Sequence, residues 1–547
     1  MYRLTGLRLS GSASTSILCV VLGWITTPAV STSAQSMVEQ LPSASEQTKD
    51  ALGAGKSPFA QPMSTVDSMK DKAEATNQDE ANAWGPVSTE KASWANVAPA
   101  LLPYFNNGPV FGVPGTDVSD FWHRTQFTGD WGGVRTDLAR HGLFFDLYST
   151  SAHQDVASGG LKTGSAFIQD TQLSINIDTG RAGLWPGGLF HVTLESRYGS
   201  SSAQQSFSVG STVPHYTGLA YPGPFFVRDV LPTKYFLLQS LTPKFSVLLG
   251  RIDVLAMCDR TLFGNSYKFD FANLNFNKNP MALNFYNTTS LSAVALWAPS
   301  QKLVVFGGVF DPNSQADNLA TKAFNRVNLY GAAIFAYKIG GLPGQSWAQF
   351  NWTNKPKINL GTPFAQLPSG TSSQALGILL GSPSVQGVPI NYESDSWLTI
   401  ENFSQYLFVR DHPSEIAHKL GSGQTLRGVG VFGRVGYAPQ QTNTITRDAS
   451  MALFAHGVFD FRKDDSFGAG FYYNGIGSPL KLDIEQLSGS KNTVQNEKGS
   501  EIFYDFAITP AIRFIPSYQH IWDPLTAEVT RHQRGADVFL ARFAVIW

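Results

Sequence analysis

Apolar and polar side chains alternate repeatedly from residue 127 to the end of the chain. The alternation is cleanest in residues 171–178, where Leu173, Ile175 and Ile177 are separated by polar residues. A Gly/Pro-rich turn follows, and residues 190–197 repeat the same alternation. A period of two is typical of a β-strand with one apolar face and one polar face. The pattern therefore predicts an all-β fold.

The connections between these predicted strands differ in length. Strands at 291–297 and 303–310 are joined by about five residues, whereas polar or Gly/Pro-rich segments occupy 254–280, 354–394 and 476–499. Short turns on one rim and long loops on the other are typical of an outer-membrane β-barrel. No run of 18 or more apolar residues follows the N-terminus, which excludes helical membrane spans. The alternation alone would also suit a water-soluble β-sandwich, and that alternative stays open here.

Aromatic residues gather near the ends of the predicted strands, which favours the interfacial girdles of a membrane barrel. They are Trp297, Trp347, Trp352, Trp397, Tyr472, Tyr473 and Trp522. The chain also stops on an alternating strand, residues 537–547, whose last residue is Trp547. Chain termini usually fray, so an apolar terminal strand also favours a barrel.

The most specific motif lies in residues 127–150. Its first part, T-G-D-W-G-G, is a glycine-rich turn, and Val134 to Arg140 are predicted to form two helical turns ended by Gly142. This stretch resembles the T-G-D-W-G-G-x-R-x-x-L-x-x-x-G signature of the OprB-like family of carbohydrate-selective porins. The matching residues are Thr128, Gly129, Asp130, Trp131, Gly132, Gly133, Arg135, Leu138 and Gly142. Residues 249–253 and 397–407 are also similar to family motifs.

The resemblance covers most of 127–547 and none of 35–110. It implies a transmembrane antiparallel β-barrel of 16 strands, with short periplasmic turns and long extracellular loops, in the bacterial outer membrane. By length alone, 14 or 18 strands would also fit. The implied function is passive diffusion of neutral monosaccharides such as glucose into the periplasm, by a monomer or a homotrimer. The implied partners are outer-membrane lipid and the barrel-assembly machinery, which recognises a terminal strand like the one ending in Trp547.

The chain divides into three predicted regions. Residues 1–34 have the positive start, apolar core and small-residue end of a secretory signal peptide. Residues 35–120 are rich in Ser, Ala, Gln, Glu, Lys and Pro, and they predict a low-complexity periplasmic extension. A short helix that tethers the protein to the cell wall or to partner subunits is the alternative for this region. Residues 121–547 are predicted to form the barrel domain.

Composition narrows the classes of function. Charged residues make up 15% of the chain, below the roughly 25% of a typical soluble domain. The 40 basic and 41 acidic residues form no basic stripe, so nucleic acid is not an expected partner. Of two cysteines, Cys19 falls in the predicted signal peptide, which leaves Cys258 and no internal disulfide. The ten histidines form no metal motif, and we expect neither a metal nor a cofactor.

Charged, amide and aromatic side chains are mixed in the segment that follows the predicted strand end at Asp253. Sugars present hydroxyl groups and apolar C–H faces, which planar polar groups and aromatic rings can bind. We predict that this segment folds into the lumen and forms a sugar constriction. The candidates are Arg251, Asp253, Arg260, Phe263, Phe269, Asp270 and Asn273, with Glu195 and Arg197 as second candidates. The alternative is that the aromatics pin the loop to the wall and the charges pair with one another.

Residues 428–433 match the dinucleotide-binding pattern G-x-G-x-x-G. Such a site needs a helix directly after the glycines, but Gly436 and Pro439 follow here, so we predict strand glycines that face a loop. The chain has no G-x-S-x-G elbow, and no local pattern marks a glycosidase carboxylate pair. Catalysis is therefore not expected. A secreted β-rich carbohydrate-binding protein or glycosidase, and a structural envelope porin of general selectivity, remain the alternatives.

Overall fold

The structure is a computed structural model of the full chain. It describes residues 92–97, 120–199, 209–212, 230–254, 259–266, 268–282, 285, 289–314, 323–380, 388–421, 423–489 and 494–547. The predicted signal peptide and most of the predicted extension lie outside the described residues.

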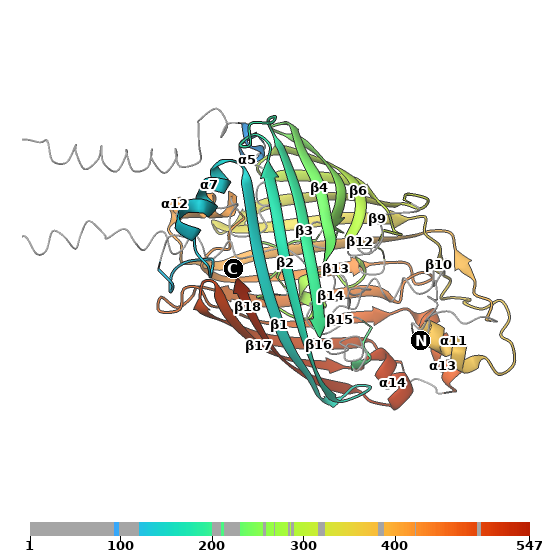
Figure 1. Cartoon of the computed structure of the whole chain (residues 1–547). Helices are drawn as coiled ribbons and strands as arrows, with labels where there is room; N and C mark the ends of the chain where they lie inside the picture. Colours follow the sequence, from blue (N-terminus) through green and yellow to red (C-terminus); the bar gives the residue numbers. More distant parts are fainter. Residues whose placement is uncertain are drawn as a thin grey trace, which may run out of the picture.

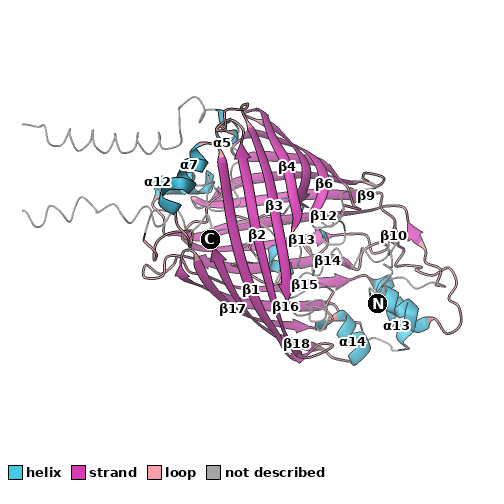
Figure 2. Ribbon diagram, viewed as in Figure 1, coloured by secondary structure: helices cyan, strands magenta, loops and turns pink. Residues whose placement is uncertain are grey.

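Sixteen antiparallel strands close into one barrel (Figures 1 and 2). They are β1 (Leu143–Gly159), β2 (Gly164–Asp178), β3 (Gly188–Gly199), β4 (Leu231–Thr242), β5 (Phe245–Asp253), β6 (Thr289–Ser300), β7 (Leu303–Phe310), β8 (Asn328–Ile339), β9 (Leu342–Thr353), β12 (Ser396–Val409), β13 (Gly428–Tyr437), β14 (Ile445–His456), β15 (Ser466–Ile476), β16 (Glu497–Thr509), β17 (Ile512–Trp522) and β18 (Gly535–Ile546). Each strand pairs with its neighbour in the chain, and β1 also pairs with β18. The predicted barrel and its strand number are confirmed.

The two rims of the barrel differ as the sequence predicted. On one rim, which we call the short-turn rim, four connections have only two residues: 243–244, 301–302, 340–341 and 510–511. The opposite rim, the long-loop rim, carries 254–288, 354–395 and 477–496. The connection that contains α12 (Pro413–Gly421) is the longest one on the short-turn rim.

Short helices decorate both rims (Figure 2). On the long-loop rim, α11 (Ser372–Leu379) packs on α13 (Ser478–Ser488), and α14 (Leu525–Arg531) lies near them; the two-stranded ribbon of β10 (Lys357–Ile358) and β11 (Tyr392–Glu393) is at the same rim (Figure 1). Within the described part of the chain, no helix combines the length and the apolar character needed to cross a membrane.

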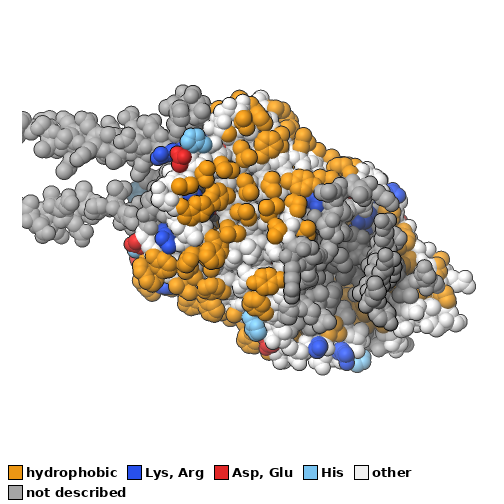
Figure 3. Space-filling model, in the orientation of Figure 1, with side chains coloured by type: hydrophobic (Ala, Val, Ile, Leu, Met, Phe, Trp, Pro, Cys, Tyr) orange, Lys and Arg blue, Asp and Glu red, His pale blue; other side chains and the backbone are white. Residues whose placement is uncertain are grey.

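The barrel is apolar outside and polar inside. Leu249, Phe350 and Phe539 are more than half exposed on the outer face, whereas Arg434 and Arg542 are fully buried inside. Figure 3 shows hydrophobic side chains spread over the barrel wall, with the charged side chains of this view towards the rims. In water such an outer surface would be an aggregation site, and in a bilayer it is the stable arrangement.

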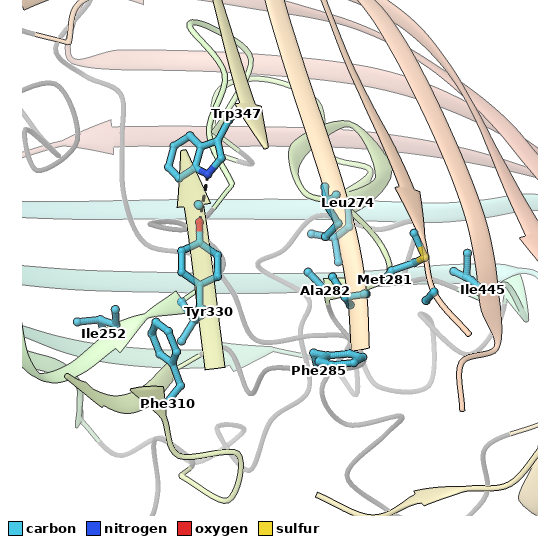
Figure 4. Close-up of a cluster of buried hydrophobic side chains, with 14 of the residues drawn as sticks. Ile252, Leu274, Met281, Ala282, Phe285, Phe310, Tyr330, Trp347 and Ile445 are labelled. Carbon is cyan, nitrogen blue, oxygen red and sulfur yellow. Dashed lines mark hydrogen bonds between the residues drawn. The ribbon is translucent and has the colours of Figure 1, made fainter. Parts of the chain in front are cut away.

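The predicted aromatic girdle is only partly present on the outer face. Trp297 and Trp522 are exposed there. Trp347 and Tyr472 are instead fully buried inside the barrel, where Trp347 Nε1 donates to the Tyr330 hydroxyl over 3.1 Å (Figure 4). For these two residues the girdle prediction is wrong, because alternation puts them on the inner faces of β9 and β15.

The glycine-rich motif before β1 fastens the barrel where it closes. It forms a 3-10 turn, η3 (Trp131–Gly133), and then α7 (Val134–Arg140), as predicted. The buried guanidinium of Arg135 donates to the carbonyl oxygens of Trp547 and Phe145, each over 3.1 Å. Trp131 stacks on Phe145 at 5.1 Å between ring centroids. We call this arrangement the Arg135 clasp, because it joins the two terminal strands of the barrel.

Replacing Arg135 by Met should weaken the barrel at its closure. The change removes two hydrogen bonds from a charged donor, and each such bond contributes about 1.5–3 kcal/mol. We expect heat-modified migration in detergent gels to begin at a lower temperature. The exposed Arg140, one turn away, gives the matched control Arg140→Met. Equal transition temperatures for the two variants would contradict the clasp.

Candidate functional site

The connection from β5 to β6 comprises residues 254–288, and we call it the inward loop because its described residues fold into the barrel. Its described side chains contact the inner faces of strands far away in the sequence. Phe263 is fully buried and lies 4.8 Å from the ring of Tyr406 and 5.6 Å from that of Phe454. Phe271 lies 4.7 Å from Phe503. These contacts run along the inner wall from β12 to β16, so the loop narrows the lumen from that side.

Glycines in the wall make room for these aromatic rings. A Cβ on Gly430 would lie 2.3 Å from the ring of Phe263, and one on Gly470 would lie 2.5 Å from the ring of Phe276. Gly430 belongs to the G-x-G-x-x-G match, which lies on β13 and is followed by a strand rather than a helix. The structure thus gives this glycine the loop-facing role that the sequence predicted.

Polar contacts fix the rest of the inward loop. Arg434 on β13 pairs with Asp259 over 2.9 Å, and both side chains are buried. The Glu501 carboxylate on β16 accepts from the backbone N–H groups of Ala272 and Asn273 over 2.8 and 2.7 Å. Each buried charge is therefore paired or hydrogen-bonded, as burial in a low dielectric requires.

Opposite this wall, charged side chains of β2 and β3 face the lumen. Arg197 binds Glu195 over 2.5 Å and Asp170 over 3.3 Å. Asp170 accepts from Gln172 over 2.6 Å, and Gln172 accepts from Lys268 of the inward loop over 2.6 Å. A continuous polar chain therefore joins the wall to the loop across the lumen.

Lys234 on β4 extends this arrangement, because it interacts electrostatically with Glu195 and with Asp253 at the end of β5. We call the following set the charged cluster: Asp170, Glu195, Asp253, Arg197, Lys234 and Lys268. It contains three carboxylates and three cations, so its formal charge is zero. Such a cluster offers many hydrogen-bonding groups without a strong preference for anions or cations.

The structure divides the predicted site residues into three groups. Glu195, Arg197 and Asp253 join the charged cluster, and Arg251 is buried near it with its guanidinium 5.5 Å from the Tyr235 ring. A second group lines a small cavity of about 30 Å³ under the inward loop: Arg260, Phe263, Phe269 and Asp270.

Asn273 forms the third group, because its side chain has a local structural contact. It caps α10 (Leu274–Asn277) by accepting from the backbone N–H of Asn275 over 2.9 Å. Phe263, by contrast, packs on the wall, as in the alternative in which the aromatics pin the loop to the wall and the charges pair with one another.

Several lumen residues were missed at the sequence level. Asp170 and Gln172 extend the polar face of the strand that was identified, so alternation could have found them. Lys234 follows a shift of register between β3 and β4, which interrupts the alternation that would reveal it. Lys268 reaches Gln172 only through the path of the inward loop, which no local pattern encodes.

Burial changes the acid–base behaviour of two inward-loop residues. Neither lies on a membrane-spanning strand. Burial raises the pKa of the Asp270 carboxyl to about 7, although its hydrogen bond from the Ser266 N–H opposes the shift. Burial lowers the pKa of the Lys278 ammonium to about 7, although Asp259 opposes that shift. Both groups therefore change charge near neutral pH.

No group of three or more His, Cys, Asp or Glu side chains able to hold a metal ion occurs within the described ranges.

Comparison with models of protein families gives a match that covers more than half of this chain. The model of the family described as carbohydrate-selective porin, OprB family, matches residues 162–536. Comparison with curated protein sequences finds no match.

Among solved structures, the high-pH structure of Pseudomonas putida OprB is similar, with a TM-score of 0.62 at 17% identity, covering 78% of this chain and 100% of that one. The low-pH structure of the same protein covers 78% of this chain and 99% of that one, with a TM-score of 0.45 at 14% identity. A loop-deletion mutant of OmpT from Vibrio cholerae covers 74% and 100%, with a TM-score of 0.40 at 10% identity. The first of these similarities supports the barrel fold.

Ion selectivity should depend on pH through the inward loop. On going from pH 8.5 to pH 5.5, Asp270 loses its negative charge and Lys278 gains a positive charge, because both pKa values are about 7. In planar bilayers under a KCl gradient, we expect the reversal potential to shift towards anion preference at the lower pH. Asp270→Asn should reduce this shift. A reversal potential that is the same at both pH values would contradict the prediction.

Proposed function

The chain belongs to the OprB family of carbohydrate-selective porins, and from this premise we propose how its lumen selects sugars. The protein is a porin of the bacterial outer membrane that passes carbohydrates. In that orientation the short-turn rim faces the periplasm and the long-loop rim faces the outside.

We propose that neutral monosaccharides such as glucose are the preferred solutes. The observation that carries this proposal is the charged cluster, in which Lys268 of the inward loop is linked to Asp170 and Arg197 of the wall. Its donors and acceptors can replace part of the water around the sugar hydroxyl groups. Since the cluster carries no net formal charge, it does not favour a charged solute over a neutral one.

Selection in such a pore rests on weak and exchangeable contacts. A solute must be bound well enough to enter and loosely enough to leave. The members of the charged cluster already bind one another, so a sugar exchanges one set of hydrogen bonds for another at little net cost. Transport by this route is passive and needs no catalytic step.

Two further partners follow from the same proposal. The apolar outer face would contact the acyl chains of the outer membrane. The strand β18 presents Phe539 and Phe543 outward and ends at Trp547, and we infer that barrel-assembly machinery recognises this segment.

Liposome swelling tests the preference for sugars. With the purified protein in liposomes, neutral monosaccharides should enter faster than zwitterionic amino acids of similar size, because only the sugars can exchange hydrogen bonds without disturbing the charge pairs. Equal rates for the two solute classes would identify a general pore and overturn the proposal.

Removing Lys268 tests the role of the charged cluster. The variant Lys268→Met breaks the link to Gln172 and leaves the cluster with an excess negative charge. A hydrogen bond contributes about 0.5–1.5 kcal/mol, so the ratio of sugar to amino-acid swelling rates should fall roughly two- to tenfold. The matched control is Lys302→Met in the exposed turn between β6 and β7. The same ratio in both variants would show that the cluster does not select the solute.

A further inference from the structure

A short segment far upstream of β1 is seated on the short-turn rim. It comprises residues 92–97 and includes α5 (Trp94–Val97), which Figure 1 shows at the same rim as α7 and α12. The Ala92 carbonyl oxygen accepts from the Gly187 N–H over 2.8 Å, and the Ser93 hydroxyl donates to the Asp178 carboxylate. Ser93 and Trp94 are each only 1% exposed. The segment therefore packs on the barrel.

The turn between β2 and β3 is shaped to receive this segment. A Cβ on Gly180 would lie 2.1 Å from the Ala92 carbonyl oxygen, so the close approach depends on glycine at this position. Asp178 shapes the turn as well as binding Ser93, because it accepts from the backbone N–H groups of Gly180 and Arg181 over 3.0 and 3.1 Å. The same carboxylate thus orders the turn and holds the segment.

An apolar row runs around the lumen wall next to this turn. Leu189, Leu238, Leu248 and Val294 are directly opposite one another on β3, β4, β5 and β6. All four are at most 8% exposed, and Trp94 belongs to the same cluster of buried side chains. An apolar row in a water-filled lumen is unfavourable unless something covers it. The helix α5 contacts β4, the strand that carries Leu238, so the Trp94 side chain is in position to do so.

We propose that residues 92–97 form a built-in strut that occupies the periplasmic mouth of the pore. The partner of the turn and of the apolar row is thus a segment of this same chain. The strut narrows the exit on the side of β3 to β6, and it holds the N-terminal extension at that exit through residues 92–97. This inference goes beyond sugar selection, which is assigned to the charged cluster deeper in the lumen.

The free energy that holds the strut in place comes from burial of the Trp94 indole and from a few hydrogen bonds. Burying a large aromatic side chain is among the strongest contributions that a single residue can make to docking. The bonds to Gly187 and Asp178 set the position of the segment but can be exchanged for water. Loss of the Trp94 ring should therefore release the segment while the barrel, closed by the Arg135 clasp between β1 and β18, stays folded.

Cysteine labelling reports whether the segment is seated. In a Cys258→Ser background, the change Ser93→Cys places one thiol in the contact with Asp178. It should react with a bulky maleimide at least roughly tenfold more slowly than an exposed reference thiol from Ser300→Cys, because labelling requires local opening. Adding Trp94→Ala should remove this protection. Adding Trp122→Ala, a control at a side chain that is 63% exposed, should not.

Single-channel recording then tests the effect on the pore. Trp94→Ala should raise the conductance above that of the parent protein, and Trp122→Ala should leave it unchanged. Rapid labelling of the thiol at position 93 in the parent background would contradict the packing of residues 92–97 on the barrel. If Trp94→Ala exposes the thiol at position 93 but does not raise the conductance, residues 92–97 do not narrow the exit of the pore. Sugar preference in liposome swelling is a separate measurement, so its failure would count against the proposed function and not against the strut.

Discussion

The structure depends on closing the sheet between β1 and β18. In a bilayer each unpaired backbone N–H or C=O costs several kcal/mol, so a sheet with free edges cannot stay in the hydrocarbon layer. The closing pair runs from Tyr148 opposite Ile546 to Gly159 opposite Ala536. These strands are the most distant in the sequence, and their pairing has the largest loop-closure cost of any in the sheet. The Arg135 clasp acts at this junction. The most specific motif of the sequence, at residues 127–150, therefore lies where the closure of the barrel needs the most stabilisation.

The inward loop occupies part of the lumen that the closed barrel encloses, and in the proposed function it supports the contacts that select the solute. Two kinds of contact hold the loop. Phenylalanine rings of the loop pack against glycines of the wall, and buried ion pairs such as Arg434 with Asp259 join the two. Steric contacts of this kind leave little freedom of position. Lys268 is therefore presented to β2 from a rigid support, and the charged cluster has a defined geometry before any solute arrives.

Alternation along the chain predicted the strands, because it reports which face of a strand each side chain takes, but the loop lengths, the terminal strand and the motif at residues 127–150 were needed to predict a barrel rather than a β-sandwich. Alternation does not report what covers that face. Trp347 and Tyr472 were predicted as girdle residues because they are aromatic. Their positions in the inward and outward alternation of β9 and β15 nevertheless place both side chains inside the barrel. The residues of the inward loop were identified as a set, but contacts such as Phe263 with Tyr406 join segments more than a hundred residues apart. Such contacts follow from closure of the barrel, which no local pattern contains.

The inner wall changes character along the path of a solute. At the depth of the inward loop it presents paired charges, and near the periplasmic exit it presents the apolar row of β3 to β6. A sugar that leaves the charged cluster must regain water at once, since leucine side chains accept no hydrogen bonds. An apolar row that is covered by another side chain therefore hinders the release of the sugar less than an exposed row would. In the proposed strut the indole of Trp94 covers this apolar surface, which agrees with the proposal that the contacts selecting the solute lie farther inside, in the charged cluster.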